Sequence, residues 1–201
     1  MTTIELNNGV QMPSMVVSTS YMDYPLMKDV VTAALKLGFR AFDTARDYGN
    51  EHIVGHVMKD CLAELGMKRE DVFITTKIGN SQQELGKISE QIDISLNNLE
   101  SDYIDLWMMH WPFQDKYVDT WHKMEDVYKS GKVRAIGMAN YHVRHFNHLF
   151  KQGIEITPHC VQFECHPMRT ATDIVDFCRE HNIAIQAYSP ICRMIEPIKN
   201  S

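Results

Sequence analysis

Short strand-like runs alternate with longer helical segments along most of this chain, and this alternation limits its possible folds more than any other feature. The short runs are rich in β-branched and aromatic residues, which favours strands. Their carboxyl ends follow one another at intervals of 25 to 33 residues, the length of a strand–helix unit. Because right-handed βα crossovers join parallel strands, the pattern predicts a parallel sheet. The predicted strands are residues 15–19, 41–44, 72–77, 103–109, 133–138, 159–163 and 183–188.

Three of the intervening segments have clear helical signals. Residues 25–38 and 118–131 each end at a glycine suited to a helix C-cap. Residues 84–100 repeat isoleucine and leucine every four positions, which gives one apolar face. Before the first strand, residues 3–13 (TIELNNGVQMP) predict a small β-hairpin around Asn-Asn-Gly.

Seven βα units in simple succession predict the α/β class and a (β/α)8 TIM-type barrel preceded by the hairpin. A doubly wound sheet is the alternative, but no GxGxxG follows any strand, so the dinucleotide fingerprint of that fold is missing. We expect residues 1–201 to form a single domain. Since the sequence stops soon after the seventh predicted strand, the barrel is expected to lack its last βα unit.

Composition excludes several kinds of partner. The net charge is −6 without any basic run, so no nucleic acid is expected. No apolar run approaches the roughly 20 residues needed to cross a membrane. Five cysteines, an odd number without a CxxC pair, and an N-terminus without a signal-peptide layout predict reduced thiols in a cytoplasmic protein.

Four polar side chains lie at the ends of neighbouring predicted strands or just after them: Asp43, Tyr48, Lys77 and His110. Catalytic residues of such barrels lie at the carboxyl ends of the strands. A free phenol has a pKa near ~10, and a nearby ammonium such as Lys77 would lower it. Asp43 would balance the charge of a buried Lys77, and His110 would donate to a substrate oxygen. The set predicts a device that protonates a carbonyl oxygen.

Each residue also has an ordinary structural interpretation. An aspartate at a strand end often caps the next segment, a lysine is usually solvated, and a tyrosine or histidine usually packs in the core. Spacing alone therefore leaves both interpretations open. The run of histidines at His142, His145 and His148 spreads over about 120° of a helix surface, so no metal site is predicted.

Several segments resemble the aldo-keto reductase family in the expected order and over nearly the whole chain. GFRAFDTARDYGNEHIVG (38–55) resembles its first signature, ITTKIGN (74–80) its lysine segment and MMHWP (108–112) its histidine segment. RAIGMANY (134–141), VQFECHP (161–167) and AYSP (187–190) are similar to further family segments.

This resemblance implies reduction of an aldehyde or ketone with NADPH or NADH, on a small-molecule carbonyl substrate. Tyr48 would be the general acid, Lys77 and Asp43 would tune it, and His110 would orient the carbonyl. Trp111 would line the substrate pocket. The implied cofactor-binding residues are Thr19, Asp43, Asn140, Gln162, Tyr188 and Ser189.

The chain also departs from the family pattern. Val16, Val17 and Ser18 stand where a Gly-Leu-Gly run is usual, and Ala139 replaces a serine. The late Lys-Ser…Arg segment that grips the adenosine phosphate has no counterpart, so a preference for NADP over NAD is not predicted.

Two other classes of function stay open: a non-catalytic module that binds a nucleotide or a partner protein, and a metal-dependent barrel hydrolase.

Overall fold

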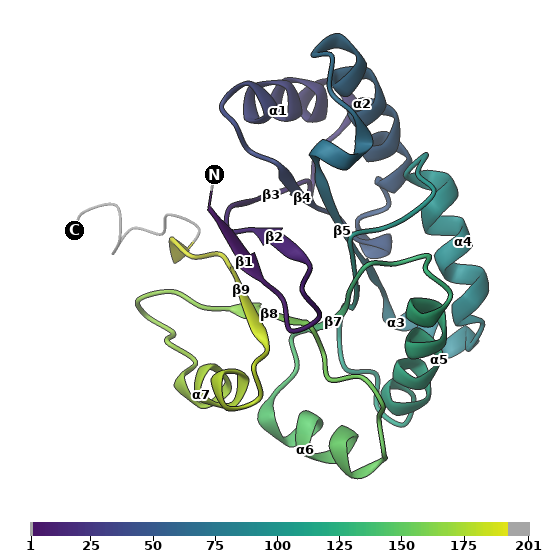
Figure 1. Ribbon diagram of the computed structural model, residues 1–201, viewed down its shortest axis with the longest axis vertical. Coiled ribbons are helices and arrows are strands. Elements are labelled where there is room, and N and C mark those ends of the chain that lie inside the picture. Colours follow the sequence, from purple (N-terminus) through teal and green to yellow (C-terminus); the bar gives the residue numbers. More distant parts are fainter. Residues whose placement is uncertain (1, 193–201) are drawn as a thin grey trace.

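The computed structural model describes residues 2–192, in which seven parallel strands curl into most of a barrel (Figure 1). The strands lie in chain order, and each is hydrogen-bonded in parallel to the next. The predicted fold class and all seven strands are therefore confirmed, with small changes at their ends. The strands are β3 (Val16–Ser18), β4 (Ala41–Asp43), β5 (Phe73–Ile78), β6 (Leu106–Met109), β7 (Ile136–Ala139), β8 (Cys160–Glu164) and β9 (Ala184–Tyr188).

The predicted N-terminal hairpin is formed by β1 (Thr3–Glu5) and β2 (Gln11–Pro13), which pair antiparallel. Its apolar side chains, Leu6 and Met12, are buried against residues at the amino ends of the barrel strands, among them Phe73 and Leu106. The hairpin thus packs against the amino ends of the strands. The hairpin does not cover the carboxyl ends of the strands, where the polar residues of the predicted site lie.

Helices cover the outside of the sheet (Figure 1). They bury apolar side chains against the outward-facing residues of the strands, in one large core that includes Trp107, Trp121 and Phe146. Two short 3₁₀ turns, Arg46–Tyr48 and Arg69–Asp71, precede α2 and β5. The helices are α1 (Tyr24–Lys36), α2 (Glu51–Glu64), α3 (Asn80–Leu85), α4 (Ile88–Asn98), α5 (Tyr117–Lys129), α6 (Val143–Lys151) and α7 (Thr172–Glu180).

The prediction of a single helix over residues 84–100 is wrong at the beginning of that segment. Helix α3 ends at Leu85, Gly86 takes a left-handed conformation with φ of 68°, and α4 begins at Ile88. A left-handed residue ends a helix because its carbonyl and amide leave the helical path, and glycine adopts it without a Cβ clash. The apolar face predicted for this segment belongs to α4, where Ile88 and Ile92 are buried.

Helix α2 lies very close to the end of α4, at Gly55. A Cβ atom at Gly55 would lie 2.3 Å from the carbonyl oxygen of Asn98. Nearby, the buried carboxylate of Glu51 accepts hydrogen bonds from Thr76 at 2.6 Å and Asn98 at 3.2 Å. The start of α2 is therefore fixed against β5 and α4, and this holds the 3₁₀ turn that precedes it.

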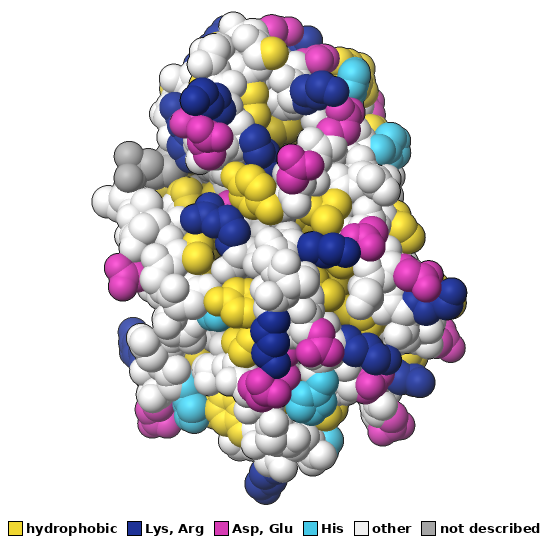
Figure 2. Space-filling model, turned by 45° about the vertical axis from the view of Figure 1, so that its right-hand side comes forward, with side chains coloured by type: hydrophobic (Ala, Val, Ile, Leu, Met, Phe, Trp, Pro, Cys, Tyr) yellow, Lys and Arg dark blue, Asp and Glu magenta, His cyan; other side chains and the backbone are white. Residues whose placement is uncertain are grey.

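Charges of both signs are interspersed on the outer face formed around α2, α4 and α5 (Figure 2). Many form exposed ion pairs, such as Lys59 with Glu100 at 2.6 Å and Lys132 with Asp93 at 2.5 Å. This face therefore presents no continuous basic surface. Within residues 2–192, no helix combines the length and apolar character needed to cross a membrane.

Candidate active site

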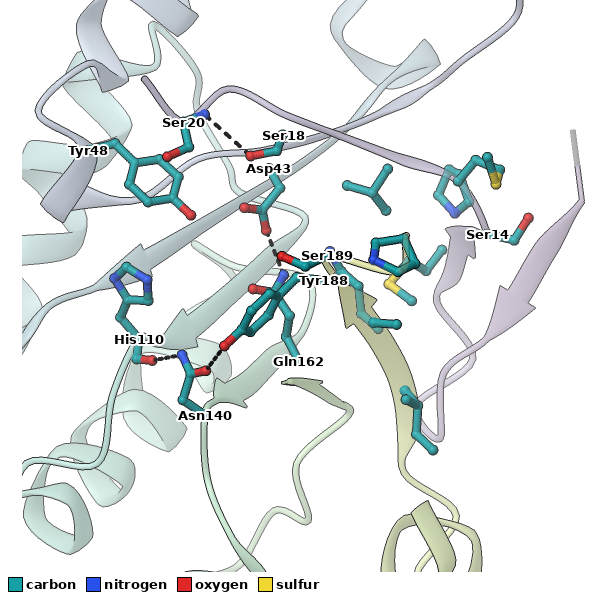
Figure 3. Close-up of a pocket in the computed structure, with 18 of the residues that line it drawn as sticks. Ser14, Ser18, Ser20, Asp43, Tyr48, His110, Asn140, Gln162, Tyr188 and Ser189 are labelled. Carbon is teal, nitrogen blue, oxygen red and sulfur yellow. Dashed lines mark hydrogen bonds between the residues drawn. The ribbon is translucent and has the colours of Figure 1, made fainter. Parts of the chain in front are cut away.

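A cavity of about 1030 Å³ opens at the carboxyl ends of the strands (Figure 3). It continues toward the space between the edge strands β3 and β9, where hairpin residues Met12 and Pro13 also line it. Most of the predicted site residues line this one cavity. They are Asp43, Tyr48, His110, Trp111, Asn140, Gln162, Tyr188 and Ser189.

Lys77 lies behind the cavity wall, with its side chain fully buried at the end of β5. Its ammonium forms an ion pair with Asp43 Oδ1, donates to the carbonyl of Thr44 at 3.1 Å and lies 3.5 Å from the Tyr48 hydroxyl. The second carboxylate oxygen of Asp43 accepts a hydrogen bond from Gln162 Nε2 at 2.9 Å. The predicted convergence of Asp43, Tyr48 and Lys77 is thus observed, and Gln162 joins it.

The predicted lowering of the Tyr48 pKa is wrong in its net direction. The pKa of Tyr48 is raised above its ordinary value, first by burial and then by the negative charges of Asp43 and nearby groups. Burial disfavours the phenolate, and Asp43 offsets the ammonium charge that was expected to stabilise it. Both effects favour the protonated form of the phenol.

A tight turn presents Tyr48 to the cavity. Arg46–Tyr48 form the 3₁₀ turn after β4, and Gly49 follows in a left-handed conformation with φ of 69°. Arg46 pairs with the buried Glu51 at 3.3 Å. The glycine allows the chain to reverse into α2, so the phenol lies over the ends of β4 and β5.

His110 follows β6 directly. Its amide donates to the Ile78 carbonyl at 2.9 Å, and its own carbonyl accepts from Asn140 Nδ2 at 3.0 Å. The imidazole lies edge-on to the Tyr48 ring, with 5.7 Å between the ring centroids. Trp111, next in the chain, is 47% exposed at the cavity rim. Tyr48 and His110 thus face the same space.

The ends of β7, β8 and β9 bring amide and aromatic groups to the cavity (Figure 3). The hydroxyl of Tyr188 donates to Asn140 Oδ1 at 2.8 Å, and Asn140 has a left-handed backbone with φ of 66°. Gln162 uses its Nε2 on Asp43, and the described residues provide its Oε1 with no donor. That oxygen can accept a hydrogen bond from a ligand amide.

Thr19 does not line the cavity. It is fully buried, and its hydroxyl donates to the Asp43 carbonyl at 3.0 Å. Its neighbours Ser18 and Ser20 line the cavity instead. In this structure Thr19 shapes the loop after β3, and its predicted cofactor contact stays a prediction.

Asp47 is a cavity residue that the sequence analysis missed. Its Oδ2 lies 2.8 Å from Nδ1 of His110. The available signal was an acidic residue directly before the candidate proton donor. The sequence does not indicate which way the Asp47 side chain points within the turn. Its direction depends on the space beside Gly79, which has no side chain.

The three histidines of the segment 142–148 take part in local packing. His148 Nδ1 lies 2.5 Å from the Tyr117 hydroxyl, and His145 contacts the rings of Tyr117 and Tyr141. Among residues 2–192, no group of three or more His, Cys, Asp or Glu side chains is arranged to hold a metal ion.

Comparison with known proteins matches these features. Residues 14–193 match the model of the Aldo/keto reductase family. The chain is 40% identical over 190 residues to the glyoxal reductase of Bacillus subtilis (strain 168), covering 94% of this chain and 67% of that protein. It therefore spans about two thirds of the length of this relative.

Solved structures agree with the fold. The aldose reductase of Schistosoma japonicum superposes with a TM-score of 0.90 at 26% identity, over 98% of this chain and 71% of that one. An aldo-keto reductase complexed with NADPH gives a TM-score of 0.87 at 29% identity, over 93% of this chain and 62% of that one.

Proposed function

The chain belongs to the aldo/keto reductase family, and from this premise we propose that it reduces an aldehyde or ketone to an alcohol with NADPH, or alternatively NADH. The observation that carries the proposal is the placement of the Tyr48 hydroxyl beside Lys77, facing the same cavity as His110. We also propose that residues 1–201 act as one domain and that the substrate is a small molecule. A cytoplasmic location and the absence of a nucleic-acid partner stay predictions.

The residues at the ends of β7, β8 and β9 suit a nicotinamide cofactor. The open Oε1 of Gln162 would accept from the carboxamide, Asn140 lies beside it, and the flat ring of Tyr188 would cover the nicotinamide. Ser189 would contact the pyrophosphate. When bound, NADPH supplies the hydride that reduces the carbonyl carbon.

Tyr48 would provide the proton. As negative charge grows on the substrate oxygen, the phenol donates to it, and an alkoxide is a stronger base than a phenolate, so the proton transfer is favourable even with a raised phenol pKa. Lys77 would stabilise the phenolate left behind, since its ammonium lies 3.5 Å from that oxygen. Asp43 supplies the counter-charge to the buried ammonium.

An assay with purified protein tests this function. The protein is mixed with NADPH or NADH and a neutral aldehyde such as benzaldehyde, and loss of reduced cofactor is compared with formation of the alcohol. We expect equal amounts of both. Cofactor binding without alcohol formation would contradict the proposal and would favour a nucleotide-binding module.

A further inference from the structure

Asp47 and His110 form a direct contact at the cavity. The carboxylate oxygen Oδ2 lies 2.8 Å from Nδ1 of the imidazole, whose side chain is 13% exposed. The other ring nitrogen, Nε2, has no hydrogen-bond partner among the described residues, and His110 lines the cavity. The contact therefore uses one ring nitrogen and leaves the second for a ligand.

Gly79, at the start of α3, makes room for this contact. A Cβ atom at Gly79 would lie 1.9 Å from Asp47 Oδ1, a distance at which the carboxylate would have to move. The backbone of Gly79 has φ of −85°, which every L-residue adopts, so glycine is not required there by backbone conformation. The missing side chain instead leaves the space that the carboxylate of Asp47 occupies.

We propose that Asp47 is a positioning residue that fixes the tautomer of His110 with the proton on Nδ1. An ionised carboxylate only accepts hydrogen bonds, so the ring nitrogen facing it must carry the hydrogen. A neutral ring then has a lone pair on Nε2. Such a ring cannot donate to a substrate oxygen and would repel it.

This assignment deepens the proposed function, on which its catalytic part rests. Only the imidazolium donates both to Asp47 and to a carbonyl oxygen at Nε2. Carbonyl reduction by this chain therefore requires the charged form of His110. The activity falls as His110 loses its proton, because the carboxylate holds the remaining proton on the wrong nitrogen for the substrate.

The other groups facing His110 do not compete for this role. From the same turn as Asp47, the Tyr48 phenol contacts the ring edge-on at 5.7 Å and stays protonated. From β5 and β4, the charges of Lys77 and Asp43 balance each other. Just after β7, the uncharged amide of Asn140 donates to the backbone carbonyl of His110. Asp47 is the charged group in direct contact with the ring.

The first test is independent of activity. Nitrogen-15 NMR of histidine-labelled protein distinguishes the two neutral tautomers, and a His110→Asn variant identifies the His110 signals. At a pH where the ring is neutral, we expect the proton on Nδ1 in the wild type. In Asp47→Ala the proton should move largely to Nε2. A wild-type ring protonated on Nε2, or the same tautomer in Asp47→Ala, would overturn the proposal.

The second test is the pH profile of kcat/KM for reduction of a neutral aldehyde. In the wild type we expect a fall of about tenfold per pH unit above the His110 titration, the slope of a single ionisation. Asp47→Ala should retain its activity to higher pH, because its neutral ring can donate from Nε2. Identical profiles for the two proteins would overturn the catalytic part of the proposal.

Two further variants separate the contact from the loss of a charge. Gly79→Ala keeps every charge but displaces the Asp47 carboxylate, so it should give the Asp47→Ala tautomer and profile. Asp102→Ala is the control: it removes an exposed carboxylate that precedes β6, whereas His110 follows this strand. Its His110 tautomer and pH profile should match those of the wild type. A wild-type profile in Gly79→Ala would count against the proposal. If the wild type reduces no carbonyl, the proposed function fails while the NMR experiment still decides the tautomer.

Discussion

The ammonium of Lys77 lies 3.5 Å from the hydroxyl oxygen of Tyr48, but its ion-pair partner is Asp43 and not a phenolate. Burial and the Asp43 charge together raise the pKa of the Tyr48 phenol. We therefore expect Tyr48 in the cofactor-free protein to titrate above the ordinary phenol value of about 10. Carbon-13 NMR of ring-labelled tyrosine, with Tyr48→Phe to identify the signal, measures this. A Tyr48 pKa below the ordinary phenol value would contradict this prediction.

The buried pair of Lys77 and Asp43 should be important for stability. Lys77→Met leaves the Asp43 carboxylate buried with Gln162 as its remaining side-chain partner, and breaking such a pair costs about 3–5 kcal/mol. Urea unfolding of the variant measures the loss. The double variant Lys77→Met, Asp43→Asn should recover part of it, because no unpaired charge is left. A free energy of unfolding for Lys77→Met within about 1 kcal/mol of the wild-type value would count against this account.

The strand order and the positions of the catalytic candidates could be predicted from sequence because they follow from periodicity. Parallel strands in succession align their carboxyl ends, so Asp43, Lys77 and His110 had to converge. The direction of the Tyr48 pKa shift could not be predicted, since it depends on burial and on which partner receives the Lys77 charge. Asp47 was missed for a similar reason: its direction depends on the space above Gly79, a contact between distant segments.

His159 should make the fold sensitive to acid. It is buried, its Nδ1 lies 2.9 Å from the Ile136 amide nitrogen, and burial lowers the pKa of its imidazole from 6.5 to about 4. Between these values the unfolded chain binds a proton that the folded chain does not, so stability falls as the pH drops from 6.5 toward 4. The expected slope is up to about 1.4 kcal/mol per pH unit for this group.

Urea unfolding across this pH range checks the His159 prediction. His159→Gln removes the titrating ring, so its stability should depend less on pH over the same range, whatever its absolute stability. Equal pH dependence in the variant and the wild type would show that His159 is not responsible.

The close approach of α2 and α4 should make Gly55→Ala destabilising. The added methyl group would lie 2.3 Å from the Asn98 carbonyl oxygen, so the helices must separate. We expect a loss of about 1–3 kcal/mol in the free energy of unfolding, despite the better helix propensity of alanine. His52→Ala, at an exposed position of the same helix, is the matched control and should change stability by less than about 0.5 kcal/mol. A more stable Gly55→Ala protein would contradict the packing.

The central claim is that the Tyr48 hydroxyl gives its proton to a carbonyl oxygen. The direct measurement is kcat/KM for aldehyde reduction by wild type and Tyr48→Phe, with the Kd for NADPH measured on both. We predict a loss of about 10²–10⁴-fold, the usual contribution of a general acid, with unchanged cofactor affinity. A Tyr48→Phe protein that reduces the aldehyde as fast as the wild type would show that the proton comes from another group.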